Sequence, residues 1–77
     1  LQPMVRQEGT VVLTSGALNL RAAPSYDAPV YLQIPNGETV TVWGEYDNWY
    51  VVEYGGTFGY VRGEYLRLNG ESVIQPR

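Results

Sequence analysis

The sequence predicts an all-β fold, a small β-barrel of five to six short strands with one 3₁₀ turn. Short segments that alternate apolar and polar residues are separated by turn residues every 8–12 residues or so, about the spacing of small barrels and sandwiches. Helical spacing of apolar residues is not found in any window of about eleven residues that lacks glycine and proline. A barrel is favoured because, in a chain of 77 residues, closure leaves fewer strand edges exposed.

The chain begins with a lead-in and two expected strands. Residues 1–9 show no periodicity and are interpreted as a linker. Residues 10–14 are rich in β-branched side chains and predict the first strand. Residues 17–21 alternate regularly, which predicts a half-buried strand with Leu18 and Leu20 facing inward.

An irregular loop follows the second strand. Two prolines within residues 22–29 remove backbone donors and fix φ, so we expect no strand there and place Tyr26 near the loop tip. Residues 30–34 return to alternation. Pro35 then predicts a type I turn, and Gly37 supplies the left-handed residue after it.

The next strand is expected at residues 38–43. Its alternation places Val40 and Val42 inward and Trp43 on the opposite side. Residues 44–48 are polar and acidic, and are interpreted as a connecting loop.

A β-hairpin is predicted at residues 49–61. The pair Gly55-Gly56 takes positive φ readily, and it separates two short segments of aromatic and β-branched residues. If Tyr54 and Thr57 flank the turn, the side chains of the first strand divide between two faces. The expected core face holds Tyr50, Val52 and Tyr54, and the other face holds Trp49, Val51 and Glu53.

The chain is expected to end with a turn, a short strand and a tail. Residues 62–64 are too few for an α-helix and predict the 3₁₀ turn. A last strand at 65–68 precedes a tail at 69–77, so the domain is expected to span residues 10–68. The predicted interior comprises Leu18, Leu20, Val40, Val42, Val52 and Val61.

Composition excludes several functional classes. The net charge of −3 and five scattered arginines lack the basic patch needed to bind nucleic acid or an anionic membrane surface. No apolar segment approaches the ~18 residues of a membrane span. The chain begins at Leu1 and is interpreted as a piece of a longer protein.

Catalysis and metal binding are not expected. The chain has no cysteine and no histidine, so it lacks an ordinary nucleophile–base pair and a Cys/His metal site. Glu45, Asp27 and Asp47 lack the ligand spacing of a calcium loop. A small barrel filled by its own side chains leaves little room for a sugar-binding cleft of the kind glycosidases use. We therefore predict a non-enzyme without a cofactor.

The aromatic residues indicate binding. Seven tyrosines, two tryptophans and one phenylalanine exceed what so small an interior can hold, and rigid surface rings make efficient contacts. Trp49 either packs at the sheet rim or forms a groove floor. Trp43 either covers the barrel or contacts a neighbouring domain. Arg21 is expected to hold the loop, by donating to carbonyls or pairing with an aspartate. Core and hairpin packing is the interpretation for Tyr50, Tyr54 and Phe58.

Five sequence blocks in a fixed order resemble the bacterial SH3 (SH3b) family. They are LNLRAAPS at 18–25, NGETVTV at 36–42, NWYVV at 48–52, GYV at 59–61 and YL at 65–66. Leu20, Asn48 and Tyr60 stand where the family usually has valine, glycine and tryptophan.

This resemblance implies an SH3-like, partly open β-barrel without catalytic activity. Such domains are commonly fused to peptidoglycan hydrolases or found in secreted and surface proteins, where they bind cell-wall peptide or act as spacers. We therefore expect a secreted or cell-surface location and a monomer.

The resemblance also brings three aromatic side chains to one side of the barrel, those of Tyr26, Trp49 and Tyr65. Nearby carboxylates, among them Glu45, would give this groove an acidic rim that favours ligands carrying amines. The predicted ligand-binding set is Tyr26, Asp27, Asp47, Asn48, Trp49 and Tyr65.

Two functional hypotheses follow. In the first, the domain recognises extended peptidoglycan peptide in the aromatic groove. In the alternative, it is a spacer or regulator packed on a neighbouring hydrolase domain of the same chain, through Trp43 or the groove. Recognition of proline-rich peptide is a third possibility that shares the groove geometry.

Overall fold

The computed structural model describes residues 7–69, which form an antiparallel sheet of seven strands and one 3₁₀ turn, η1. The sheet order is β3-β2-β6-β5-β4-β1-β7. The predicted all-β class is confirmed, and the described residues form seven strands where five to six were predicted. The elements are β1 (Gln7–Val11), β2 (Ala17–Arg21), β3 (Val30–Pro35), β4 (Thr39–Tyr46), β5 (Trp49–Tyr54), β6 (Thr57–Arg62), η1 (Gly63–Tyr65) and β7 (Leu66–Leu68).

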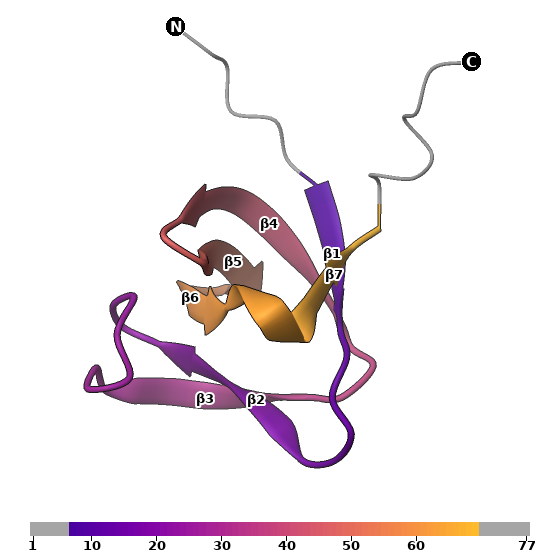
Figure 1. The fold of residues 1–77 in the computed structure, drawn as a ribbon, viewed down its shortest axis with the longest axis horizontal. Helices are drawn as coiled ribbons and strands as arrows, with labels where there is room; N and C mark the ends of the chain where they lie inside the picture. The colour runs from indigo at the N-terminus through magenta and orange to yellow at the C-terminus, as the bar shows by residue number, and fades with distance from the viewer. Residues whose placement is uncertain (1–6, 70–77) are drawn as a thin grey trace, which may run out of the picture.

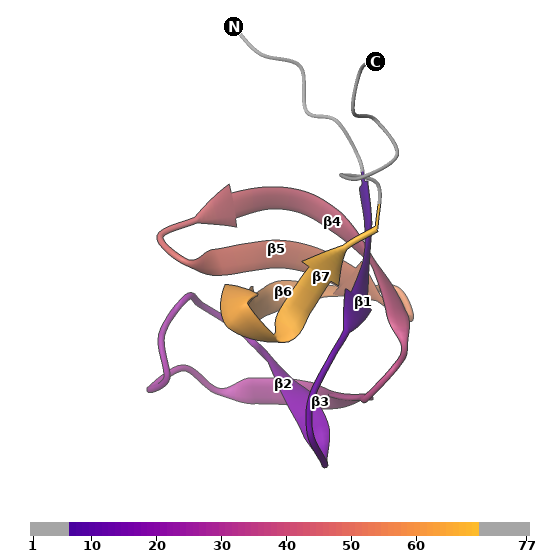
Figure 2. The ribbon, with the colours of Figure 1, turned by 45° about the vertical axis from the view of Figure 1, so that its right-hand side comes forward.

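The sheet curls around a single core (Figures 1 and 2). The β2–β3 hairpin lies on one side, strands β4, β5 and β6 lie on the other, and η1 lies between them. The long strand β4 curves so that it pairs with β5 along one part and with β1 along another. A register shift between Val42 and Gly44 marks the bend. The result is a partly open barrel.

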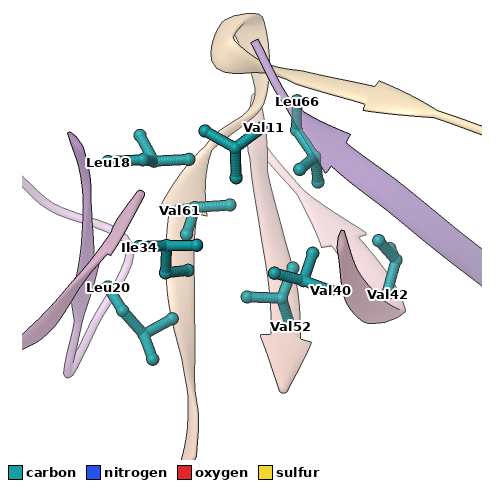
Figure 3. Packing of buried hydrophobic residues seen from close by; sticks show 9 residues of the cluster. All are labelled: Val11, Leu18, Leu20, Ile34, Val40, Val42, Val52, Val61 and Leu66. Carbon is teal, nitrogen blue, oxygen red and sulfur yellow. The ribbon is translucent and has the colours of Figure 1, made fainter. Parts of the chain in front are cut away.

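The core combines side chains from both sides of the barrel. Leu18, Leu20 and Ile34 approach from the β2–β3 hairpin, and valines of β4, β5 and β6 meet them (Figure 3). All six predicted core residues are buried, which confirms that prediction. The buried cluster also includes Val11, Ile34 and Leu66.

The close approach of β6 to β2 requires glycine at position 59. A Cβ added there would lie 2.8 Å from the carbonyl oxygen of Arg21 and 2.8 Å from Cγ of Leu20. The two strands pair at Arg21 and Tyr60. This narrow seam brings the loop after β2 beside the end of β6.

The first strand lies earlier than predicted. β1 begins at Gln7, where it pairs with Val42, so residues 7–9 belong to the sheet and not to a lead-in. Strand β1 ends at Val11, and Leu13 instead bonds the side chain of Asn36. The Leu13 amide donates to Asn36 Oδ1 and Asn36 Nδ2 donates to the Leu13 carbonyl, each at 2.9 Å. Predictions for residues 1–6 and 70–77 lie outside the described residues.

The predicted connection at 44–48 is wrong. β4 continues to Tyr46, and a two-residue turn at Asp47 and Asn48 leads into β5. Both turn residues have positive φ, 49° and 72°, as a type I′ hairpin turn requires. Asp and Asn tolerate this conformation better than other residues that carry side chains, which is how the turn forms without glycine.

The other turns match the predictions more closely. Tyr54 and Thr57 pair across Gly55 and Gly56, whose φ values are 59° and 84°, so the hairpin is confirmed. At Pro35 the predicted type I turn is wrong: the Glu38 amide donates to the Pro35 carbonyl, which makes Gly37 the third residue of the turn. Its φ of 91° is typical of type II.

The end of the domain is shifted by one residue. η1 spans 63–65 and not 62–64, because Arg62 is extended and pairs with Trp49 as part of β6. The last strand accordingly begins at Leu66. Asn69, predicted as tail, donates its amide to the Glu8 carbonyl at 2.8 Å. In residues 7–69 no helix is long and apolar enough to cross a membrane.

Candidate functional site

An open cavity of about 560 Å³ lies where the loop after β2, the start of β5 and η1 meet. We call it the aromatic groove. Three of its lining side chains are aromatic, namely Tyr26, Trp49 and Tyr65. Two are cationic, Arg21 and Arg62, and the remaining wall comes from residues 12–15 and 17–19.

Trp49 forms the floor of the groove. It is the first residue of β5, and only 5% of its surface is exposed. The ring of Tyr26 lies over it edge-on, with centroids 5.2 Å apart and planes at 63°. Packing and the groove floor, which the sequence left as alternatives, are therefore combined in one side chain.

Tyr26 stands on a loop that Arg21 holds in place. Nη1 of Arg21 donates to the carbonyl oxygens of Tyr26 at 2.9 Å and Ala28 at 3.0 Å. The backbone of Ala22 also donates to Pro29 across the loop base, at 2.9 Å. These bonds confirm that Arg21 holds the loop through carbonyls. Tyr26 itself remains 60% exposed, so its ring is available to a ligand.

Arg62 lines the groove beside two of its rings, although it is not among the predicted site residues. It is the last residue of β6 and lies directly opposite Trp49 in the sheet. Its guanidinium carbon is 5.6 Å from the Trp49 ring centroid and 5.8 Å from that of Tyr26. Such distances are those of cation–π contacts, which fix the guanidinium against both rings.

Tyr65 forms the wall at the end of η1. The negative charge of Glu64 and a hydrogen bond with its side chain raise the pKa of the Tyr65 hydroxyl above the ordinary 10.0. Burial and Tyr26 act in the same direction, and the positive charge of Arg62 opposes them. The hydroxyl therefore stays protonated throughout the physiological pH range.

Replacing Glu64 with glutamine is expected to lower the pKa of Tyr65 toward its ordinary value, because the largest cause of the shift is removed. Ultraviolet titration of tyrosinate, with Tyr65→Phe to assign the signal, measures this. The folded pKa is raised, so this group's contribution to stability is complete below pH 10.0 and is lost as the pH rises through the folded pKa. An unchanged titration in Glu64→Gln would contradict the assignment.

Three of the six predicted site residues do not line the groove. Asp27 is exposed, and its amide donates to Ser25 Oγ. Asp47 and Asn48 form the β4–β5 turn, and Asn48 lines a neighbouring cavity of about 400 Å³. That cavity shares Arg62 with the groove and contains Glu45 and Glu64. The predicted acidic residues are therefore not part of the lining of the aromatic groove, whose charged lining residues are arginines.

Phe58 is also placed differently from the prediction. It is 55% exposed on the outer face of β6 and does not pack in the interior. Its ring lies 6.3 Å from that of Trp43, whose Nε1 donates to Glu53 at 3.3 Å. Tyr50 and Tyr54 do pack against the core cluster, as predicted.

The lining of the groove combines apolar, aromatic and cationic side chains. Its wall supplies rings, two guanidinium groups and small polar side chains. Among residues 7–69 no group of three or more acidic residues is placed to hold a metal ion.

Comparisons with known proteins agree with this architecture. The profile of the bacterial SH3 domain family matches residues 16–67, which is more than half of the chain. Such domains are binding or accessory modules and are generally not catalytic. No curated protein sequence matches the chain.

A solved structure shows the same fold. The structure of NlpC2 from Trichomonas vaginalis superposes with a TM-score of 0.73 at 22% sequence identity. The match covers 82% of this chain and 23% of that one, so this chain spans about a quarter of that protein. On the strength of the family match, this chain belongs to the bacterial SH3 domain family.

Proposed function

We propose that this domain is a non-catalytic accessory module that binds extended bacterial cell-wall peptide in the aromatic groove. The observation that carries the proposal is the meeting of Tyr26, Trp49 and Tyr65, from three separate elements, around one open cavity. Rings of this kind stack on peptide groups with little loss of side-chain entropy. Peptidoglycan is the cell-wall polymer we propose as the ligand, and a secreted or surface location follows from it.

Affinity for a single peptide should be modest. The groove is small and open, and a flexible peptide loses conformational freedom when it binds. Many weak sites along an insoluble polymer would raise the apparent affinity, because dissociation from one site is followed by rebinding at the next.

Replacing Tyr26 with alanine is expected to weaken retention on purified sacculi at least about fivefold, corresponding to roughly 1 kcal/mol. The ring is 60% exposed, so its removal should leave the fold intact while removing one wall of the groove. Tyr46→Ala is the matched control, because Tyr46 is 61% exposed and lies outside the groove lining. Equal retention of both folded variants would refute the groove assignment.

A second candidate function rests on the outer face of the sheet. Phe58 is exposed beside Trp43 there, and neither residue lines the aromatic groove. In this alternative the domain is a spacer or regulator, and that face packs on a neighbouring domain of the same chain. The isolated domain would then not bind sacculi, whereas Phe58→Ser would weaken the interdomain contact.

A further inference from the structure

We infer that the aromatic groove takes a carboxylate of its peptide ligand, and that Arg62 is the residue that binds it. This inference rests on the proposed function and names the ligand group that the groove recognises. It replaces the amine that an acidic rim would have favoured.

The first observation is the state of the Arg62 guanidinium. Its Nε atom is buried and has no hydrogen-bond partner within residues 7–69. Its described contacts are the faces of Tyr26 and Trp49, which accept no conventional hydrogen bond. Arginine carries a fork of N–H donors and no acceptor, so this group needs oxygen acceptors from elsewhere. Because Nε itself is covered, a ligand carboxylate would bind the Nη end of the fork.

The second observation is that the two arginines of the groove differ in their hydrogen bonds. Arg21 uses Nη1 on two loop carbonyls and is therefore a structural residue of the groove. Arg62 has no such bond within residues 7–69 and is already fixed by the two rings. A guanidinium held in one orientation loses little freedom when it binds a planar carboxylate through two parallel hydrogen bonds.

The third observation is the charge around the groove. Among residues 7–69 no aspartate or glutamate lines the groove, although the chain as a whole has a net charge of −3. Glu45 and Glu64 line the neighbouring cavity. A ligand amine in the groove would be repelled by two guanidinium groups. A carboxylate would meet them with complementary charge.

Chemical variants of one peptide test the inference on the unmodified domain. The probe is the synthetic stem peptide L-Ala–γ-D-Glu–L-Lys–D-Ala, which carries both carboxylates and amines. We expect amidation of its carboxylates to weaken binding about tenfold, as the loss of one charge-assisted bond pair predicts. Acetylation of its amines should weaken binding by less. Titrations followed by NMR give each dissociation constant.

Protein variants identify the residue. In Arg62→Met, which keeps the length of the side chain and its contact with the rings, the free and amidated peptides should bind equally. Arg62→Lys keeps the charge but loses the fork, and should retain part of the preference. Arg67→Met is the matched control, because Arg67 is exposed on β7 away from the groove, and its preference should equal that of the unmodified domain.

The outcomes separate this inference from the proposed function. If sacculi retain the domain but the amidated peptide binds as well as the free acid, or neither binds, the carboxylate inference is overturned and the proposed function stands. If the acid is preferred equally by the domain and by Arg62→Met, Arg62 is not the receptor and the inference is overturned. If sacculi do not retain the domain, the proposed function fails and the inference falls with it.

Discussion

Replacing Trp49 with alanine is expected to lower the free energy of unfolding by about 3–5 kcal/mol, the usual cost of truncating a buried aromatic side chain. The indole is 5% exposed and contacts Tyr26 and Arg62, and its removal would leave a cavity beside them. A domain of this size has an expected stability of about 5–15 kcal/mol, so the loss would be a large fraction of the total. Urea denaturation measures it.

Trp43→Ala is the internal control for this measurement. Trp43 is the other tryptophan of the chain and is half-buried on the outer face, so its removal should cost less. If the two variants lose equal stability, Trp49 is not the packed floor of the groove. Because Trp49→Ala is expected to change stability as well as binding, Tyr26→Ala is the cleaner probe of the groove.

Replacing Leu20 with alanine is expected to cost about 2–5 kcal/mol of unfolding free energy. Leu20 is fully buried, and it packs where Gly59 brings β6 close to β2. The cavity would therefore open at the narrow seam between the two halves of the sheet. The surrounding backbone cannot collapse easily into it, because both strands are already held by their hydrogen-bonding partners.

Leu32→Ala is the matched control for this core position. Leu32 lies directly opposite Leu20 in the β2–β3 ladder but is half-buried, so the same chemical change should cost less. Denaturant midpoints with unchanged slopes would show that both values report stability. Equal losses in the two variants would contradict the placement of Leu20 at the centre of the core.

Much of the fold follows from local pattern. The alternation of apolar and polar residues correctly predicted β2 and the inward valines of β4. The glycine pair correctly predicted the β5–β6 turn and the register of the two strands. The errors in strand bounds lay mainly at polar strand ends. Gln7 and Glu8 form strand through ladder bonds with β4, which no apolar pattern signals. The sequence at the end of β4 predicts a loop because it lacks buried apolar residues. Glu45 and Tyr46 are exposed there and pair with β5.

The candidate site was predictable in part. Tyr26, Trp49 and Tyr65 were selected as surplus aromatic residues, and the structure places all three in one groove, although their role in binding stays a prediction. Asp27 was predicted to bind ligand because it is next to Tyr26 in the chain. Its side chain is not part of the groove lining.

Arg62 was the residue that pattern reasoning missed. A signal for it existed, because pairing Tyr54 with Thr57 across the glycine turn places Arg62 opposite Trp49. Assigning Arg62 to the 3₁₀ turn concealed this pairing. The lack of a partner for its Nε depends on the positions of every neighbouring group, and no sequence pattern contains that information.

The central claim is that cell-wall peptide binds in the aromatic groove, and the two indole N–H signals test it most directly. Trp49 lies in the groove, and Trp43 lies on the outer face beside Phe58. On titration of the isotope-labelled domain with soluble peptidoglycan fragments, we expect saturable NMR shifts at Trp49, Tyr65 and residues 17–19, with Trp43 unmoved. Shifts centred on Trp43 and Phe58, or no shifts at all, would contradict the account.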